Sequence, residues 1–148
     1  MTRPALVPEL SVSDLSKSMA FYVDLLGFRI EYDRPEEKFA ALSLGSAHLM
    51  LEQAASNKRA TAEEFQAGQW RTADLERPFG RGLNLEIEVE DLAPMVSRLS
   101  AHAYSLLLEP HEKSRRVGKK NRVVRELLVA DPDGYLIRLS QPIDRGGI

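Results

Sequence analysis

The chain has 148 residues, of which 43% are apolar and 28% charged, and it contains no cysteine. This composition is typical of a globular protein. The net charge of −2 argues against nucleic-acid binding through phosphate attraction. The absence of cysteine excludes thiolate metal sites and cysteine nucleophiles. The N-terminus lacks the apolar stretch of a secretory signal, and no segment is apolar enough to span a membrane. We therefore expect a cytoplasmic protein with neither a nucleic-acid nor a membrane partner.

A strand-into-helix passage occurs twice, over residues 10–22 and 87–99, with Asp14 and Asp91 in the same place in each copy. A carboxylate suits the first turn of a helix, because it accepts hydrogen bonds from free backbone N–H groups and favours the positive end of the dipole. The spacing of apolar residues predicts one amphipathic helix from Asp14 to a stop at Gly27, and a second helix after Asp91.

Three segments of strand character follow each predicted helix. They are residues 28–32, 39–44 and 47–52 after the first helix, and 104–108, 123–130 and 135–140 after the second. The tight turn 131–134 joins the last two. The layout is βαβββ twice, which predicts an α+β fold of two paired modules. One such module has too small a core to stand alone, so we expect a single domain over 1–148, with module one at about 4–53 and module two at about 82–142.

An insertion of about 54–81 separates the two modules. Residues 61–64 (Thr-Ala-Glu-Glu) match a capping box and predict a short helix. Insertions of this length are either functional lids or plain decoration. Trp70 within it provides either a stacking surface for a ligand or an ordinary packed side chain.

Strand alternation sorts side chains onto two faces. In residues 83–89 the apolar odd positions face the helices, and Asn84, Glu86 and Glu88 point the other way. Counting back from the first helix by the same offsets places Glu9 in the position of Glu86, and places Leu6, Pro8, Leu10 and Val12 toward the helices. Two interpretations stay open for the polar face. It is the wet side of an antiparallel sheet, or it lines a concave, charged pocket.

The segments 12–15, 21–28, 88–91 and 131–135 resemble the vicinal oxygen chelate superfamily, also called the glyoxalase/bleomycin resistance/dioxygenase superfamily. The resemblance covers nearly the whole chain except the insertion and the last few residues. It implies paired βαβββ modules that form a curled mixed sheet around a cavity, with the helices on the outer face, commonly in a dimer.

Metal-using members of that family take one ligand from the first strand and one from the last strand of each module. The resemblance maps these ligands onto Val7, Asn84, Arg138 and Met50, or onto Glu52 if the register slips by two. A valine and a methionine offer nothing useful to such a cation, and Arg138 brings a permanent positive charge. The resemblance therefore implies no metal centre and no cofactor here. We expect the histidines, His48, His102 and His111, to be structural or surface residues.

The branch that the chain resembles most is the bleomycin resistance proteins, which bind and sequester a drug without altering it. Residues 7–10 resemble their N-terminal strand, where a proline at the place of Pro8 helps to form an exchanged-arm dimer. We therefore expect a homodimer with Leu6 and Pro8 in its interface. Residues 125–127 resemble their late strand, although Val123-Val124 stand where those proteins usually carry a Trp-Gly pair.

We predict metal-independent binding of an antibiotic-type small molecule that is cationic and aromatic. Carboxylates in a partly dry cleft attract a cation, and flat rings add stacking or cation–π contacts. Arg138 is the competing explanation, as an internal counter-ion to those carboxylates. The candidate ligand-binding residues are Glu9, Asp33, Phe39, His48, Met50, Glu52, Trp70, Asn84, Glu86 and Arg138.

Two alternatives stay open: a metal-dependent lyase, isomerase or dioxygenase of this family, and a metal-free enzyme with Glu86 or Glu9 as general base. The basic run 113–125 predicts a solvated hairpin loop rather than a nucleic-acid site, since no aromatic residue interrupts it.

Overall fold

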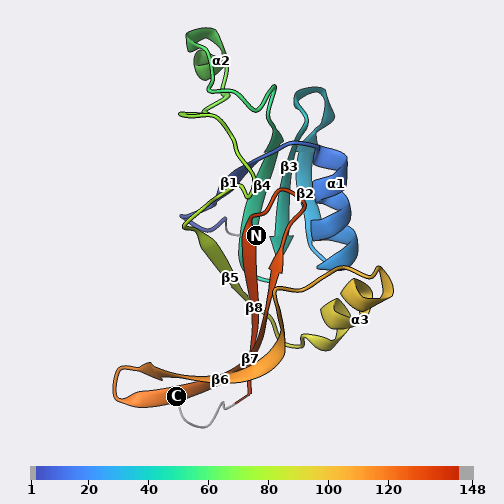
Figure 1. The fold of residues 1–148 in the computed structure, drawn as a ribbon, viewed down its shortest axis with the longest axis vertical. Coiled ribbons are helices and arrows are strands. Elements are labelled where there is room, and N and C mark those ends of the chain that lie inside the picture. Colours follow the sequence, from blue (N-terminus) through green and yellow to red (C-terminus); the bar gives the residue numbers. More distant parts are fainter. Residues whose placement is uncertain (1–2, 144–148) are drawn as a thin grey trace. The chain divides into compact units, whose positions relative to one another are not determined.

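The computed structural model describes residues 3–143 (Figure 1). It contains two four-stranded sheets, with strand orders β1-β4-β3-β2 and β5-β8-β7-β6. In each sheet the first strand runs parallel to the last, and the other pairs are antiparallel. This arrangement confirms the α+β class and the repeated βαβββ layout. The described residues form two compact units, one of residues 3–79 with Pro132–Gly134, and one of Gly80–Asp131 with residues 135–143.

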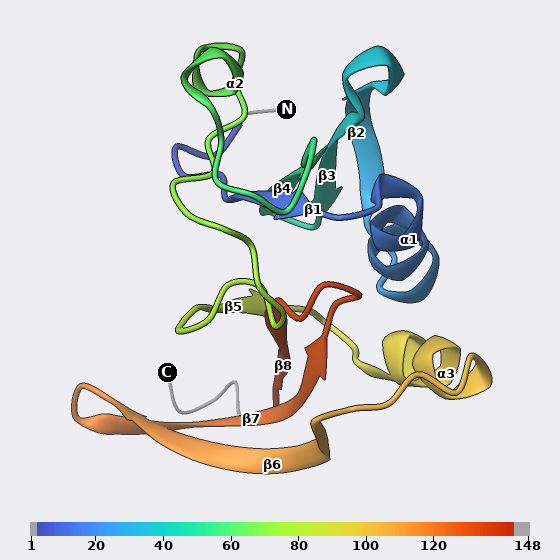
Figure 2. The same cartoon turned by 45° about the horizontal axis from the view of Figure 1, so that its top comes forward.

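The elements follow the predicted order in both units (Figure 2). The first unit contains β1 (Glu9–Val12), α1 (Leu15–Met19), the π-helix η1 (Ala20–Leu25), β2 (Arg29–Arg34), the 3-10 helix η2 (Pro35–Glu37), β3 (Phe39–Leu44), β4 (Ala47–Gln53) and α2 (Ala62–Gln66). The second unit contains β5 (Asn84–Glu88), α3 (Ala93–Ala101), β6 (Leu108–Val117), β7 (Lys120–Ala130) and β8 (Leu136–Pro142).

Both predicted helix starts involve their aspartate. Asp14 caps α1 by accepting a hydrogen bond from the Lys17 N–H at 3.2 Å. Asp91 lies one residue before the N-cap of α3 and accepts from the Ala93 N–H at 3.0 Å. The first helix continues as η1, in which hydrogen bonds skip one residue more than in an α-helix. Gly27, with φ of 89°, follows it in the left-handed region that favours glycine.

The helix-facing residues of the strands are mostly as predicted. Leu10 and Val12 of the first unit and Ile87 of the second are buried. Leu83 is an error, since it precedes β5 and is half exposed. Leu6 is 83% exposed in the single chain, and its burial between two chains stays a prediction.

The basic run is not a loop, and the predicted strand at 104–108 is misplaced. The sixth strand begins at Leu108, and the run forms the distal parts of β6 and β7, joined at a turn that contains Gly118. β8 pairs with β7 only from Val124 onward, so the end of the hairpin is a two-stranded ribbon. Charged residues fit this ribbon because backbone pairing needs no apolar side chains where both faces meet water. In the part of the chain described, no helix is long and apolar enough to cross a membrane.

Candidate functional site

The first sheet has one apolar face that contributes to the core and one polar face. Directly paired residues point to the same side of a sheet, so the registers give the rows of side chains that cross the polar face. From β1 to β2, the first row is Glu9, Met50, Ala41 and Tyr32, and the second is Ser11, Glu52, Phe39 and Arg34. We call this surface the first polar face. It brings together five of the predicted site residues: Glu9, Phe39, His48, Met50 and Glu52.

A β-bulge in β2 decides which side chains of that strand join the first polar face. The register shifts between Ile30 and Tyr32, so that Tyr32 pairs with Ala41 and Asp33 with Ala40. Without the bulge, the alternation would place Asp33 on the polar face and Tyr32 on the other. Asp33 instead lines a separate hollow beside α1. The prediction that Asp33 and Glu9 share a surface is therefore wrong.

A cavity of about 160 Å³ opens on the first polar face. Ala41, which has a small side chain, is one of the residues that line it. The side chains that surround it include those of Arg3, Val7, Glu31, Tyr32, His48 and Met50. The Ser43 hydroxyl donates a short hydrogen bond to Glu31, which lowers the pKa of that carboxyl. The cavity thus combines apolar walls with an ionised carboxylate and an imidazole.

Glu9 and Glu52 are the two carboxylates of the first polar face with raised pKa values. Partial burial raises the pKa of Glu9, and the charge of Arg34 opposes that rise. Burial also raises the pKa of Glu52, with a further contribution from the charge of Glu9. Within residues 3–143, Glu9 forms no ion pair. A cation bound between these two groups would remove the repulsion that disfavours their ionised forms.

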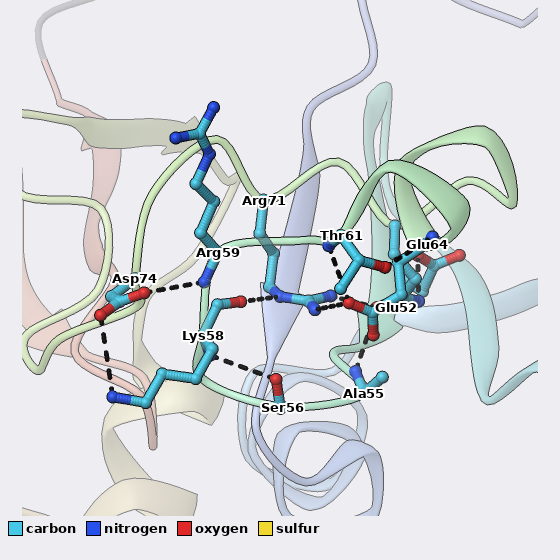
Figure 3. A network of polar contacts seen from close by, with 10 residues as sticks. Glu52, Ala55, Ser56, Lys58, Arg59, Thr61, Glu64, Arg71 and Asp74 are labelled. Atoms are coloured by element: carbon cyan, nitrogen blue, oxygen red, sulfur yellow. Dashed lines mark hydrogen bonds and ion pairs between the residues drawn. The ribbon is translucent and has the colours of Figure 1, made fainter.

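The insertion reaches the first polar face through Glu52 (Figure 3). Its centre is Arg71, whose side chain is buried, donating to the Lys58 carbonyl at 2.7 Å and to Gln69 Oε1 at 2.6 Å. Glu64 lies 3.2 Å from the same guanidinium. Gln69 donates in turn to Glu52 Oε1 at 2.9 Å. The insertion is therefore an ordered element that holds one carboxylate of the candidate site.

The short helix of the insertion confirms the capping box, because the Thr61 and Glu64 side chains and N–H groups bond reciprocally. Trp70 is 63% exposed and donates to the Phe65 carbonyl at 2.9 Å. The interpretation of Trp70 as an ordinary packed side chain is therefore wrong. Arg71 was missed, since only a fold that closes around it reveals an arginine as a core residue.

The second sheet carries a polar face of a different kind, which we call the second polar face. Its two central rows, from β5 to β6, are Glu86, Arg138, Leu128 and Leu108, then Glu88, Ser140, Glu126 and His111. Arg138 lies 3.6 Å from Glu86, and the Ser140 hydroxyl donates to the same carboxylate at 3.1 Å. Arg122 pairs with Glu88. Asn84, at the start of β5, pairs with Leu136 and is exposed.

Glu126 is the most deeply buried charge on the second polar face, at 3% exposed. Arg115 donates two hydrogen bonds to it, each at 2.8 Å, and this contact lowers the pKa of Glu126. His111 Nε2 lies 3.4 Å from the same carboxylate. Each of these three glutamates thus has an arginine partner, and the Glu86–Arg138 pair is the one that the counter-ion interpretation predicted. Glu126 and Arg115 were not among the candidates, although a lone glutamate in the apolar run 123–130 was the signal for a buried ion pair.

The residues at the family's ligand positions do not fit a metal. Glu9 pairs with Met50 as Glu86 pairs with Arg138, so Met50, and not Glu52, is the counterpart of Arg138. The first unit then offers a valine and a thioether, and the second offers an amide beside a guanidinium. This set lacks the carboxylate, imidazole or thiolate donors of catalytic divalent ions. Among the described residues, no three His, Asp or Glu side chains are grouped so as to hold a metal ion.

Comparison with known proteins gives a family model and several solved structures. The model described as the glyoxalase/bleomycin resistance protein/dioxygenase superfamily matches residues 6–139. A member of that superfamily from Vibrio splendidus 12B01 is 33% identical over 91% of this chain and 95% of its own, with a TM-score of 0.40. No curated protein matches the chain.

Two further structures share the fold at lower identity. A virulence protein from Salmonella typhimurium is 23% identical, covering 95% of this chain and 98% of its own, with a TM-score of 0.62. A lactoylglutathione lyase from Agrobacterium tumefaciens is 17% identical, covering 97% and 98%, with a TM-score of 0.60.

Proposed function

Because the chain belongs to the glyoxalase/bleomycin resistance protein/dioxygenase superfamily, we propose that it captures a cationic, aromatic small molecule, as the bleomycin resistance branch does, without a metal and without changing a bond. The observation that carries this proposal is Glu9. It is a carboxylate at an exposed position of β1, with a pKa raised by desolvation and no ion pair in the described chain, and Glu52 lies in the next row of the same face. Antibiotic-type ligands are the class we propose for it.

The chemistry of the first polar face suits such a ligand. Charge attraction in a partly dry cleft is less screened than in bulk water. The rings of Tyr32 and Phe39 lie 6.0 Å apart on the same face, and a cation over an aromatic ring gains about 0.5–2 kcal/mol. The adjoining cavity gives an apolar part of the ligand a place beside Met50 and Ala41. We further propose that the protein acts as a homodimer in which Leu6 and Pro8 are buried.

An enzyme with Glu9 as general base is the second candidate. The raised pKa of Glu9 favours it, since a carboxylate with a raised pKa is a stronger base than an ordinary one. Sequestration returns its ligand unchanged, whereas the enzyme converts it. The fate of the ligand therefore separates the two proposals.

The test uses the full chain and the flat cationic dye acriflavine as a probe. We expect saturable binding with about one dye per chain, a raised melting temperature, and recovery of intact dye by mass spectrometry. Affinity should fall as salt rises, because the attraction is electrostatic, and it should be the same with and without a chelator. Absence of binding, or affinity that requires a divalent ion, would contradict sequestration. For the dimer, light scattering at micromolar concentration should give twice the chain mass, and a monomeric mass would exclude it.

A further inference from the structure

Arg34 lies where the first polar face would hold the charge of its ligand. The central carbon of its guanidinium is 4.0 Å from the centre of the Phe39 ring and 5.9 Å from that of Tyr32. The bulge in β2 creates this arrangement, because it turns Tyr32 and Arg34 toward the same face as Phe39. A planar cation of the chain itself thus covers the aromatic surface that a ligand would use.

The two sides of this contact differ in how firmly they are held. Phe39 is 2% exposed on the central strand β3, and Glu52 is its paired neighbour on β4. Arg34 is at the end of β2, with a side chain that is 42% exposed. Its Nε lies 2.5 Å from Glu37, and its side chain also hydrogen-bonds to Tyr32. An exposed ion pair of this kind contributes about 0–1 kcal/mol. The ring is therefore fixed, while the guanidinium is held by an exposed ion pair, a hydrogen bond to Tyr32 and the cation–π contact itself.

The contact also indicates which chemical class of cation fits against the rings of Phe39 and Tyr32. A guanidinium is flat, delocalised and weakly hydrated, so it stacks on a ring, whereas an ammonium is a compact and strongly hydrated point charge. The positive charge of Arg34 acts to lower the pKa of both Glu9 and Glu52, so the guanidinium interacts electrostatically with both carboxylates. A flat amidinium or aromatic cation would take the same ring surface and meet the same carboxylates.

We propose that Arg34 and the ligand compete for the ring of Phe39, and that the ligand is therefore a planar, delocalised cation that displaces the guanidinium. This inference rests on the proposed function and adds to it the class of ligand and a residue that limits affinity. In the opposite arrangement, Arg34 would bind an anionic group of the ligand, and its removal would weaken binding.

The experiment measures benzamidinium binding to the full chain by calorimetry. We compare the wild type with Arg34→Ala and with the control Arg29→Ala. Arg29 is on the same strand, pairs with Ser43 and lies 3.2 Å from Glu31, so its removal changes the net charge equally without uncovering Phe39. We expect Arg34→Ala to bind about tenfold more tightly, the gain of one uncovered cation–π contact, and Arg29→Ala to change by less than about twofold. Benzamide, the neutral analogue, should show no gain.

Each other outcome counts against the proposal. If both variants bound benzamidinium equally more tightly than the wild type, the change in net charge alone would explain the effect. Weaker binding by Arg34→Ala would show that Arg34 contacts the ligand. Unchanged affinity in Arg34→Ala, with clear binding by the wild type, would overturn the competition but leave the proposed function standing. Absence of benzamidinium binding by all three proteins, with acriflavine bound by the wild type and no more tightly by Arg34→Ala, would overturn the competition but leave the proposed function standing, and failure of both probes would overturn the proposed function as well. Thermal melts of Arg34→Ala and Arg29→Ala serve as the control that both variants fold.

Discussion

The two sheets have the same topology but differ in whether the carboxylates of their polar faces form ion pairs. Glu9 and Glu86 hold the same place, each on the first strand of its unit, and each is paired across the sheet with one residue of the last strand. That residue is Met50 in the first unit and Arg138 in the second. Glu86 therefore has an ion-pair partner, whereas Glu9 has none among the described residues and is influenced only by the charge of Arg34. Under the proposed function, this one neighbouring side chain decides whether the carboxylate attracts an external cation or an internal one.

The next row repeats the contrast. In the second row, β3 of the first unit carries Phe39, and the equivalent strand of the second unit, β7, carries Glu126. Phe39 lies beneath the guanidinium of Arg34, and Glu126 accepts two hydrogen bonds from that of Arg115. An arginine covers the central strand in both units, but it is held by a ring in one and by a buried carboxylate in the other. The second polar face therefore compensates its buried carboxylate internally.

The largest expected effect is on stability, in the variant Glu126→Ala. Its carboxylate is buried and twice hydrogen-bonded. Breaking a fully buried pair costs about 3–5 kcal/mol, and the partial exposure of Arg115 reduces the expected loss to about 2–3 kcal/mol. Glu9→Ala should change the free energy of unfolding by less than about 0.5 kcal/mol. Urea denaturation of both variants measures this, and equal losses would contradict the contrast between the faces.

The same ion pair predicts an acid limit to stability. Because the folded-state pKa of Glu126 is lowered, its contribution is complete above the ordinary pKa of a glutamate and is lost as pH falls through the lowered value. The unfolding free energy of Glu126→Gln should therefore fall less steeply below about pH 4.5 than that of the wild type.

The next largest effect is expected from Met50→Arg, which places the residue of the second unit in the first. The new guanidinium should pair with Glu9 as Arg138 does with Glu86, and should weaken acriflavine binding by about thirtyfold, since a charge-assisted contact contributes about 2 kcal/mol. Met50→Leu is the matched control and should bind within about twofold of the wild type. Wild-type affinity in Met50→Arg would show that the Met50–Arg138 difference does not separate the two faces.

Much of this contrast follows from the sequence, but its decisive pairs do not. The helix aspartates and strand alternation place Glu9, Glu86 and their neighbours on the correct faces. The bulge that moves Asp33 away has no local signal, because a bulge is a property of two strands and not of one. The basic run predicts a loop instead of a hairpin for the same reason, since the pairing of its two strands is not visible in either strand alone. Arg71 and Glu126 are buried only through partners distant in the chain, which alternation and composition do not reveal.

A smaller effect is expected from neutralising single carboxylates. Glu9→Gln should weaken acriflavine binding by about fivefold to tenfold, because one desolvated charge contact is lost. Glu86→Gln removes the same charge from the equivalent position, where Arg138 already compensates it, and should change the dissociation constant by less than about twofold. Equal losses in the two variants would assign the ligand to both faces.

The smallest effect is a pH dependence of binding. The pKa values of Glu9 and Glu52 are raised above 4.5, so acid protonates them earlier than ordinary glutamates. Affinity for acriflavine should decline severalfold between pH 7.5 and pH 5, with a weaker decline in Glu9→Gln. The effect on stability has the opposite sign to that of Glu126. Folding favours the protonated forms, so the contribution of these two groups decreases as pH rises above 4.5. Constant affinity over this range would show that neither group meets the cation.

The hydrogen bond from Gln69 to Glu52 means that substitutions in the insertion and substitutions on the first polar face are expected to depend on each other. A mutation at Glu52 would loosen the segment organised around Arg71, and would expose it to proteases, before it altered which guests are accepted. Among the described residues, Glu9 forms no comparable hydrogen bond to the insertion. Natural variation that tunes the choice of guest is therefore expected to accumulate around Glu9 and Met50, while Glu52, Gln69 and Arg71 are kept or lost together.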